Sequence, residues 1–175
     1  EKMSFELSIL DAIQNVFQCS FMDKAMPLVT KLGDNGVFWI VCALVLLFIP
    51  KTKRMGIAIA VSLILELLIC NILLKPLVAR VRPCDVNTAF TLLVSRPVDY
   101  SFPSGHTCAS FAAMSAILFS KNRLWIPAAV IAVVVAFSRL YLYVHYPSDV
   151  LAGALLGMLC GWLACVNTKK ESDQY

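Results

Sequence analysis

The chain has 175 residues, a length that suits one domain, and 59% of them are apolar, with a mean hydropathy of +0.78. Soluble domains contain roughly 45–50% apolar residues, so the composition excludes an ordinary soluble protein and predicts an all-α bundle of membrane-spanning helices. The net charge is +4, and we expect membrane lipids rather than nucleic acid as partners.

Residues 1–35 are expected to form an amphipathic N-terminal segment. Charges occur throughout it and no long apolar stretch is present, so it does not resemble a cleavable signal peptide. One helix is expected near the start, either lying in the membrane interface or packed on the bundle, and a second around residues 23–31. The apolar positions of the first helix are Phe5, Ile9, Ala12, Ile13, Val16 and Phe17, opposite Glu6 and Asp11.

About five membrane spans are expected within a transmembrane core that covers residues 36–166. A helix needs about 20 residues to cross the hydrocarbon core of a bilayer, and two of the apolar stretches reach that length directly. The first and third are shorter and need flanking residues to span. The stretches are 36–49, 55–74, 105–119, 124–144 and 149–166.

Basic residues between the spans predict the topology. Cytoplasmic loops carry an excess of Lys and Arg, so three clusters are assigned to the cytoplasm of a protein in the plasma membrane. Residues 75–104 and 144–148 then face the extracytoplasmic side. The clusters are Lys51, Lys53 and Arg54, then Lys121 and Arg123, then Lys169 and Lys170 in a cytoplasmic tail, 167–175.

Four cations break this rule because they lie on the predicted outer side. A functional use, such as phosphate binding, would explain why they are kept there. They are Lys75, Arg80, Arg82 and Arg96.

Three glycines recur every four residues in the last span, at Gly153, Gly157 and Gly161. Small residues at this spacing allow two helices to approach closely in lipid. The pattern favours packing inside the bundle over a dimer interface, and the sequence assigns no oligomeric state.

The seven cysteines contain no Cys-x-x-Cys pair and no zinc-type ligand spacing, so no metal and no cofactor is expected. Most lie in apolar stretches, where cysteine behaves as a small hydrophobic residue. Cys84 is the exception, since it lies in a polar loop and could be reactive.

A long polar connection follows the second apolar stretch. Pro83 is expected to end that helix, and residues 83–102 are rich in turn-forming residues. Loops of this length in compact folds are usually functional. Within it, residues 89–94 are apolar. They are expected to dip into the membrane surface or touch a lipid tail, and the alternative is a short structural helix packed on the bundle.

The first candidate site element is the pair Lys75 and Arg82, which are seven residues apart. Two helical turns separate them, so one helix would present both on one face. A lysine supplies a point charge and an arginine a planar fork that suits phosphate oxygens. The alternative is a pair of cations that anchor a helix end at the membrane surface.

The second element is Pro103–His106, which reads Pro-Ser-Gly-His before an apolar helix. Ser104 is a favoured N-cap, and the first amides of a helix bind anions. Gly105 permits close approach of the backbone to phosphate oxygens, and His106 could donate a proton to a leaving oxygen. The alternative is an ordinary capped helix with an interfacial histidine.

The third element combines Arg139, His145 and Asp149. His145 and Asp149 are one helical turn apart if a helix starts near Pro147. The carboxylate could then bond one imidazole nitrogen, fix the tautomer and leave the other nitrogen free to attack. The alternative is a His-Asp bond that only closes a loop.

The three elements together read Lys75-x6-Arg82-Pro83, Pro103–His106, and Ser138-Arg139-x5-His145-x3-Asp149. This order and spacing resemble the three-part signature of the type 2 phosphatidic acid phosphatase superfamily, over residues 75–149 and with every signature position filled. The chain is shorter than many membrane members, which have six spans, and amphipathic segments take the place of the N-terminal span.

The resemblance implies a metal-independent phosphatase with a phosphohistidine intermediate. His145 would be the nucleophile, Asp149 would orient it, and His106 would protonate the leaving oxygen and then activate water. The related haloperoxidases bind vanadate in a similar pocket, but a membrane-embedded chain favours the phosphatase. The residues that would hold the phosphoryl oxygens are Lys75, Arg82, Ser104, Gly105 and Arg139.

The expected substrate is a lipid phosphate or diphosphate, with undecaprenyl diphosphate favoured. Phosphatidic acid, phosphatidylglycerol phosphate and diacylglycerol diphosphate stay open, because the signature reads the phosphate and not the tail. The hypothesis from another class is a non-catalytic transporter or binding protein for lipid phosphates. Such a protein would use the cations but would not need two histidines with an aspartate one turn away.

Overall fold

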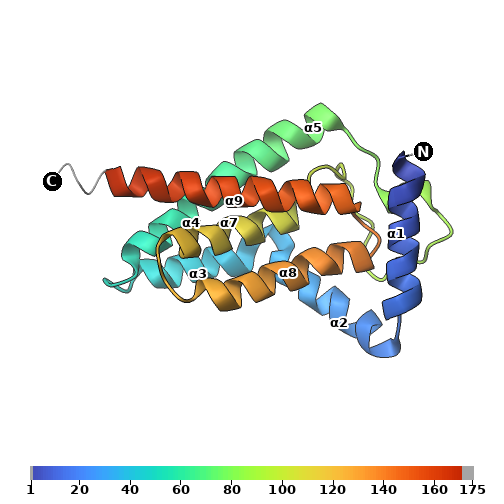
Figure 1. Cartoon of the computed structure of the whole chain (residues 1–175), viewed down its shortest axis with the longest axis horizontal. Coiled ribbons are helices and arrows are strands. Elements are labelled where there is room, and N and C mark those ends of the chain that lie inside the picture. Colours follow the sequence, from blue (N-terminus) through green and yellow to red (C-terminus); the bar gives the residue numbers. More distant parts are fainter. Residues whose placement is uncertain (1, 171–175) are drawn as a thin grey trace.

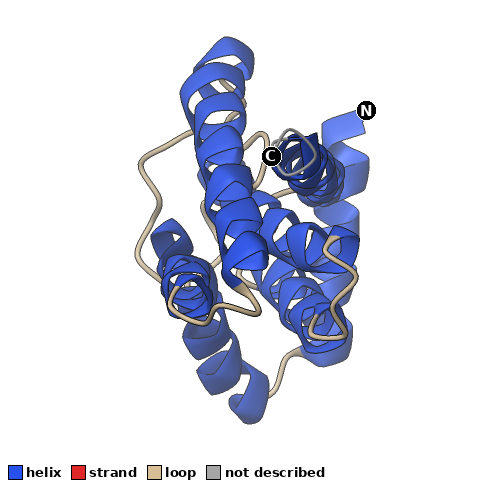
Figure 2. Cartoon of the chain, turned by 90° about the vertical axis from the view of Figure 1, so that its left-hand side faces the viewer, coloured by secondary structure: helices blue, strands red, loops and turns tan. Residues whose placement is uncertain are grey.

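The chain folds into a bundle of helices, shown by a computed structural model that describes residues 2–170, with side chains described for residues 5–166 (Figure 1). Within these residues there are helices and loops and no strand (Figure 2). The elements are α1 (Lys2–Phe17), α2 (Ser20–Thr30), the 3-10 segment η1 (Lys31–Gly36), α3 (Val37–Leu47), α4 (Lys53–Glu66), the π-helical segment η2 (Leu67–Leu74), α5 (Lys75–Val78), α6 (Pro83–Val86), α7 (Gly105–Phe119), α8 (Trp125–Tyr141) and α9 (Pro147–Lys170).

Each predicted apolar stretch corresponds to a helix. Among residues 2–170, three helical segments are long and apolar enough to cross a membrane, and two shorter apolar helices are α7 and α8. The first span gains length from α2, which continues into α3 through a kink at Asp34 and Asn35, where the φ of Asn35 is +49°. The long segments are Ser20–Phe48, Lys53–Val86 and Pro147–Val166.

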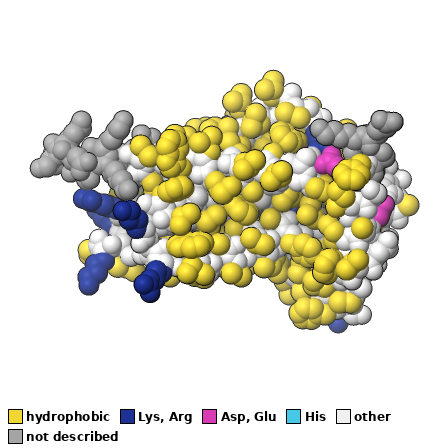
Figure 3. Space-filling model, viewed as in Figure 1, with side chains coloured by type: hydrophobic (Ala, Val, Ile, Leu, Met, Phe, Trp, Pro, Cys, Tyr) yellow, Lys and Arg dark blue, Asp and Glu magenta, His cyan; other side chains and the backbone are white. Residues whose placement is uncertain are grey.

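The outer surface of the bundle suits a lipid environment. Apolar side chains cover the visible face along its length, and basic side chains gather at one end (Figure 3). That end holds the loops between α3 and α4 and between α7 and α8, so two of the predicted basic clusters lie together there (Figure 1). Lys169 and Lys170 of the third cluster, and the predicted tail 167–175, lie outside the residues whose side chains are described.

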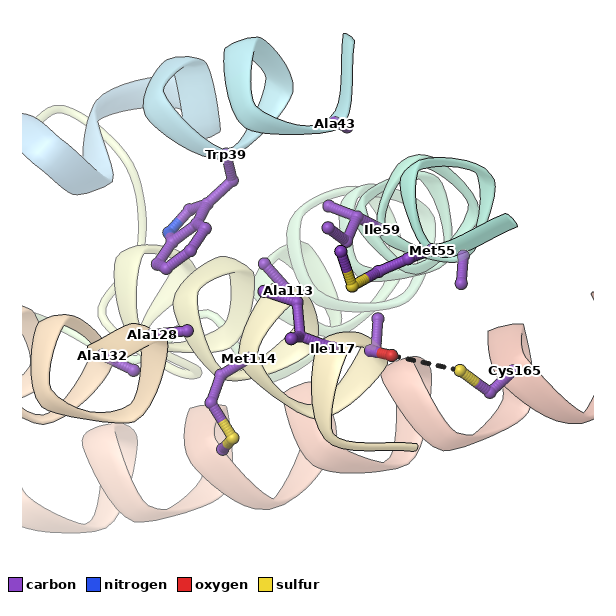
Figure 4. Close-up of a cluster of buried hydrophobic side chains, with 12 residues drawn as sticks. Trp39, Ala43, Met55, Ile59, Ala113, Met114, Ile117, Ala128, Ala132 and Cys165 are labelled. Atoms are coloured by element: carbon purple, nitrogen blue, oxygen red, sulfur yellow. Dashed lines mark hydrogen bonds between the residues drawn. The ribbon is translucent and has the colours of Figure 1, made fainter. Parts of the chain in front are cut away.

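Helix α7 is the centre of the bundle, because its side chains are small. Ala112, Ala113 and Ala116 are buried, which allows neighbouring helices to approach its backbone. Trp39 of α3 and Ile59 of α4 point toward α7 in the core (Figure 4). Trp39 donates its indole N–H to the hydroxyl of Ser110 at 3.1 Å, so the one polar atom of this large side chain is satisfied.

The glycines of α9 pack against α7, as the sequence predicts. A Cβ placed on Gly157 would lie 2.3 Å from the carbonyl oxygen of Cys108, and one on Gly153 would lie 2.6 Å from that of Ser104. On Gly161 a Cβ would collide with the side chain of Ser115. The small-residue pattern therefore serves contact inside the chain, where the two helix backbones almost touch.

Helix α1 lies across one end of the bundle, opposite the basic loops (Figure 1). It buries a different face from the one that its apolar residues suggest. Glu6, Leu10 and Gln14, at four-residue spacing, face the bundle, while Phe5 and Val16 are exposed. The helix is thus packed on the bundle through a partly polar stripe. Ile13 also packs against a core cluster and Phe17 against the ring of Phe137, while Phe5 and Val16 remain free to contact lipid.

We expect the substitution Gly157→Ala to destabilise the bundle by about 1–3 kcal/mol, because the added methyl forces α7 and α9 apart. Thermal unfolding in detergent measures the effect. Leu155→Val, on the exposed face of the same helix, is the matched control and should leave the midpoint unchanged. Equal midpoints for Gly157→Ala and the unmodified chain would contradict the close packing.

Candidate active site

The ends of α5, α7, α8 and α9 bring the three sequence elements together at the α1 end of the bundle.

The first element is built differently from the prediction. The helix ends at Val78, Ala79 is left-handed with φ of +49°, and Arg82 is extended, so Lys75 and Arg82 do not share one helical face. Pro83 starts the short helix α6 and does not end the span.

A bend of the chain brings the two cations together instead. Lys75 and Arg82 both bind the carboxylate of Asp99, Arg82 at 2.6 Å through Nη2. Arg82 also donates to the carbonyl oxygen of Val144 at 2.7 Å, which ties it to the residue directly before His145 in the third element. Its side chain is only 3% exposed, so it points into the protein and not toward the membrane surface.

The second element lies at the start of α7, as predicted. Ser104 is at the N-cap, but its hydroxyl pairs with the hydroxyl of Thr107 at 2.9 Å and not with a helix amide. A Cβ on Gly105 would lie 2.9 Å from Asn71 Oδ1 and 3.6 Å from Lys75 Nζ. The absence of a side chain at Gly105 therefore lets the lysine lie close to the helix terminus.

His145 lies between α8 and α9 and is held by both of its ring nitrogens. Nδ1 is 2.7 Å from the carbonyl oxygen of Ser101, which can only accept, so Nδ1 carries the proton. Nε2 is 3.1 Å from Arg82 Nη1 and accepts from it. Burial lowers the pKa of His145 to about 3, and the imidazole is neutral at physiological pH.

Asp149 lies beside His145 but does not make the predicted hydrogen bond to its ring nitrogen, because the carbonyl oxygen of Ser101 takes that place. Helix α9 begins at Pro147 as expected, and the Asp149 carboxylate lies 3.7 Å from Nδ1 of His145. It accepts hydrogen bonds from the Ser101 hydroxyl at 2.5 Å and the Tyr146 amide at 2.9 Å. Ser101 thus connects Asp149 to His145, a role that no spacing pattern indicated.

One cavity of about 1090 Å³ collects most of the predicted site residues. Ser104 and Asp149 are fully buried behind it. Apolar residues, among them Ile40, Leu63 and Leu67, line another part of its wall. The predicted residues that line it are Lys75, Arg82, Gly105, His106, Arg139 and His145.

Residues of the segment before α3 line the cavity beside His106 and Arg139. The carboxylate of Asp34 is 2.8 Å from Nε2 of His106, and a Cβ on Gly33 would collide with the His106 ring. Arg139 binds the hydroxyl of Thr30, yet its buried Nε has no hydrogen-bond partner among the described residues. An oxyanion in the cavity would satisfy such a donor.

Asp99 forms ion pairs with Lys75 and Arg82, two of the cations that the sequence assigns to phosphate. Burial alone would raise its pKa, but the hydrogen bond from Lys75 and the charge of Arg82 outweigh this and hold the pKa of Asp99 well below its usual range. Its side chain is 47% exposed and comes from the irregular connection before α7. A carboxylate in this position is ionised, and a phosphate bound to Lys75 and Arg82 would have to compete with it.

The long connection also corrects two expectations. Residues 89–94 do not form a helix, and Leu92 and Val94 pack against the cluster that contains Tyr141 and Val144. Cys84 is fully buried, so it does not have the accessibility that a reactive thiol needs.

Three potential metal ligands lie close together inside the bundle, although no spacing in the sequence predicted this. Ligand atoms of Glu66, Cys70 and Cys108 all fall within 4.8 Å of one another. Asn71 donates to Glu66 at 2.8 Å, in the π-helical segment that precedes Lys75. Of the three ligands, only Glu66 lines the large cavity.

Comparisons with known proteins agree with this arrangement. The family model described as PAP2 superfamily matches residues 55–173. An undecaprenyl-diphosphatase of Sulfolobus acidocaldarius is 32% identical over 98% of this chain and 81% of its own length. A lipid A 4'-phosphatase of Bacteroides thetaiotaomicron is 38% identical over 61% of this chain and 51% of its own length.

A solved structure has the same fold. The crystal structure of a transmembrane PAP2-type phosphatidylglycerolphosphate phosphatase from Bacillus subtilis superposes with a TM-score of 0.78 at 29% identity. The similarity covers 95% of this chain and 86% of that one.

We expect Asp99→Asn to tighten binding of inorganic phosphate or vanadate by about fivefold, because a partly exposed ion pair contributes roughly 1 kcal/mol and 1.4 kcal/mol is tenfold. Isothermal titration in detergent measures the affinity. Asp23→Asn, which removes a carboxylate bonded to Tyr141 away from the cavity, is the control and should bind as the unmodified chain does. Weaker anion binding by Asp99→Asn would show that Asp99 does not compete.

The chain has two histidines, so imidazole nitrogen NMR can follow each of them. Because the folded pKa of His145 is lowered to about 3, its ring should stay neutral, with the proton on Nδ1, down to about pH 5. The variant His106→Gln leaves a single signal and assigns it. A titration midpoint near 6.5 for that signal would exclude the buried neutral imidazole.

Proposed function

The chain belongs to the PAP2 superfamily, and we propose that it is an integral membrane phosphatase that hydrolyses a lipid phosphate or diphosphate through a phosphohistidine intermediate. The observation that carries the proposal is the cavity in which a neutral, tautomer-fixed His145 lies among Lys75, Arg82 and Arg139. A transporter of lipid phosphates would use the cations, but it would not need an imidazole whose proton is fixed on Nδ1.

The first chemical step forms a P–N bond and breaks a P–O bond. Nε2 of His145 attacks phosphorus, and Arg82, which donates to Nε2 in the structure, moves its hydrogen bond to a phosphoryl oxygen. His106 gives its proton to the leaving oxygen, and the carboxylate of Asp34 stabilises the protonated ring.

The second step reverses these roles. His106, now neutral, accepts a proton from water, and the resulting nucleophile breaks the P–N bond to release phosphate. Asp149 and the Ser101 carbonyl stabilise the His145 ring while it carries the phosphoryl group. Lys75, Arg82 and Arg139 bind the phosphoryl oxygens with Gly105 and the α7 terminus, and Ser104 holds that terminus in place. The cations carry the charge, so the proposed reaction is metal-independent.

The proposed substrate is undecaprenyl diphosphate, hydrolysed to undecaprenyl phosphate. The support is the relative with that name, which matches nearly the whole chain. Apolar residues beside the cationic wall suit the first carbons of a lipid tail that follow the phosphate. Phosphatidic acid, phosphatidylglycerol phosphate and diacylglycerol diphosphate are the alternatives, since relatives with different lipid specificities share the fold.

We further propose that the site faces the extracytoplasmic side of the plasma membrane. The basic loops at the opposite end of the bundle support this orientation, because cytoplasmic loops carry the excess of Lys and Arg. The phosphate of a lipid in the outer leaflet would then enter the cavity while its tail stays in the bilayer.

We expect His145→Ala to reduce phosphate release from a panel of lipid phosphates in detergent by about 10³-fold or more. His106→Ala should instead give a burst of nitrophenol from p-nitrophenyl phosphate. Nitrophenolate leaves without a proton, so the first step proceeds, whereas the second step lacks the base that activates water. Lys121→Ala, in a loop at the far end, is the control. Steady phosphate release by His145→Ala at the unmodified rate would refute the proposed nucleophile.

Vanadate and EDTA test whether the reaction follows the proposed metal-independent phosphoryl transfer. Vanadate, which adopts the geometry of the transferring phosphoryl group, should inhibit the unmodified chain, and EDTA should leave its rate unchanged. If EDTA abolished the activity and only an added divalent ion restored it, the metal-independent reaction would be ruled out.

A further inference from the structure

Arg80 lies outside the three sequence elements, yet it contacts the residues on which they depend. Its Nη1 donates to Asp149 Oδ1 at 2.5 Å and to the Ser148 hydroxyl at 2.6 Å. Its Nη2 donates to Glu6 of α1, and its guanidinium lies 3.9 Å above the centre of the Tyr146 ring. One side chain thus joins α1 to the first turn of α9.

Glu6 is held from two directions. One carboxylate oxygen pairs with Arg80, and the other accepts the backbone amide of Ser148 at 3.0 Å, an amide at the start of α9 that has no partner within the helix. Its side chain is 9% exposed. Burial alone would raise its pKa, but the bonds from Ser148 and Arg80 hold the pKa of Glu6 below its usual value, so it is ionised.

These contacts form a continuous path to the reacting nitrogen. Arg80 binds one oxygen of Asp149, and the other oxygen accepts from the Ser101 hydroxyl. The carbonyl of Ser101 in turn accepts from Nδ1 of His145. The position of His145 therefore depends on Asp149 and Ser101, and the position of Asp149 depends on Arg80.

We propose that Arg80 is a positioning residue for the phosphatase reaction and that Glu6, on the N-terminal helix, holds Arg80 in place. The inference rests on the proposed function, in which His145 is the nucleophile. Glu6 lies outside residues 55–173, which the family model matches, so part of the active-site support comes from α1.

The chemistry of the contact requires an arginine. A planar guanidinium can bind two carboxylates and a hydroxyl and still stack on an aromatic ring, whereas a lysine ammonium is a single point charge. Asp149 is fully buried, so removal of Arg80 leaves its charge facing the charge of Glu6 with no cation between them. The Asp149 carboxylate would then move, and Ser101 and His145 with it.

The test compares Arg80→Ala, Arg80→Lys and Glu6→Gln in the full-length chain in detergent, with p-nitrophenyl phosphate and a lipid phosphate. A positioning role predicts that kcat falls on the order of 10–100-fold in Arg80→Ala, as for other outer partners of reacting groups, while KM changes little. The kcat values of Arg80→Lys and Glu6→Gln should lie between those of Arg80→Ala and the unmodified chain. Added guanidinium ion, but not ammonium ion, should restore part of the activity of Arg80→Ala.

Two controls separate positioning from general damage. Arg123→Gln removes an exposed arginine at the far end, and Asp11→Asn removes a carboxylate of α1 that binds Tyr143 and not Arg80. Both should keep the unmodified kcat. Equal losses in Glu6→Gln and Asp11→Asn would overturn the proposal, because they would indicate loosening of the whole helix.

Two further results would overturn the positioning role of Arg80. One is an unchanged kcat in a folded Arg80→Ala or Glu6→Gln variant, and the other is a change in KM with no change in kcat. If Arg80→Ala does not fold, Arg80→Lys and Glu6→Gln decide the question alone. Failure of the proposed function is recognised separately, by an unmodified chain that releases no phosphate or by a fully active His145→Ala.

Discussion

The structure depends on one electrostatic constraint, the burial of arginine side chains around a neutral imidazole at one end of an apolar bundle. Arg82 is 3% exposed and Arg139 is 5% exposed, and both line the same cavity as His145. Charges removed from water need partners, and Arg139 finds only a hydroxyl for its Nη1 and none for its Nε among the described residues. A phosphate dianion is the ligand that would complete the hydrogen bonding of this wall.

The packing of the bundle fixes where the residues of the cavity wall lie. Because α7 carries small side chains and α9 carries glycines where they meet, the two helix backbones lie almost in contact. This contact extends to the site end, where the amide of Ser104 donates to the carbonyl oxygen of Asp149 at 3.1 Å. The start of α7, with Gly105 and His106, is thereby fixed beside the start of α9.

Features that repeat along the chain could be predicted from the sequence. The apolar stretches predicted the helices, the glycine spacing predicted the contact of α9 with α7, and Pro147 marked the start of α9. Contacts that arise from irregular backbone could not be predicted. Lys75 and Arg82 meet because the chain turns at Ala79, and no periodicity indicates a left-handed alanine. The amphipathic pattern of α1 placed Glu6 on the solvent side, because hydrophobic periodicity does not recognise a polar stripe that is buried by ion pairs.

The carboxylates of Asp99 and Glu6 both bind cations at this end of the bundle, and their surroundings give them opposite properties. Asp99 is 47% exposed on an irregular connection, so water can solvate it when it separates from Lys75 and Arg82. Glu6 is 9% exposed on a helix and also accepts the Ser148 amide, so its separation from Arg80 would leave a buried charge and an unpaired amide. The same pairing chemistry therefore gives a solvated ion pair where the proposed function places the phosphate and a buried one behind Asp149. If phosphate displaces Asp99 as proposed, the site needs a support that does not move with it, and the α1–Arg80–α9 contact has the burial and bonding to provide one.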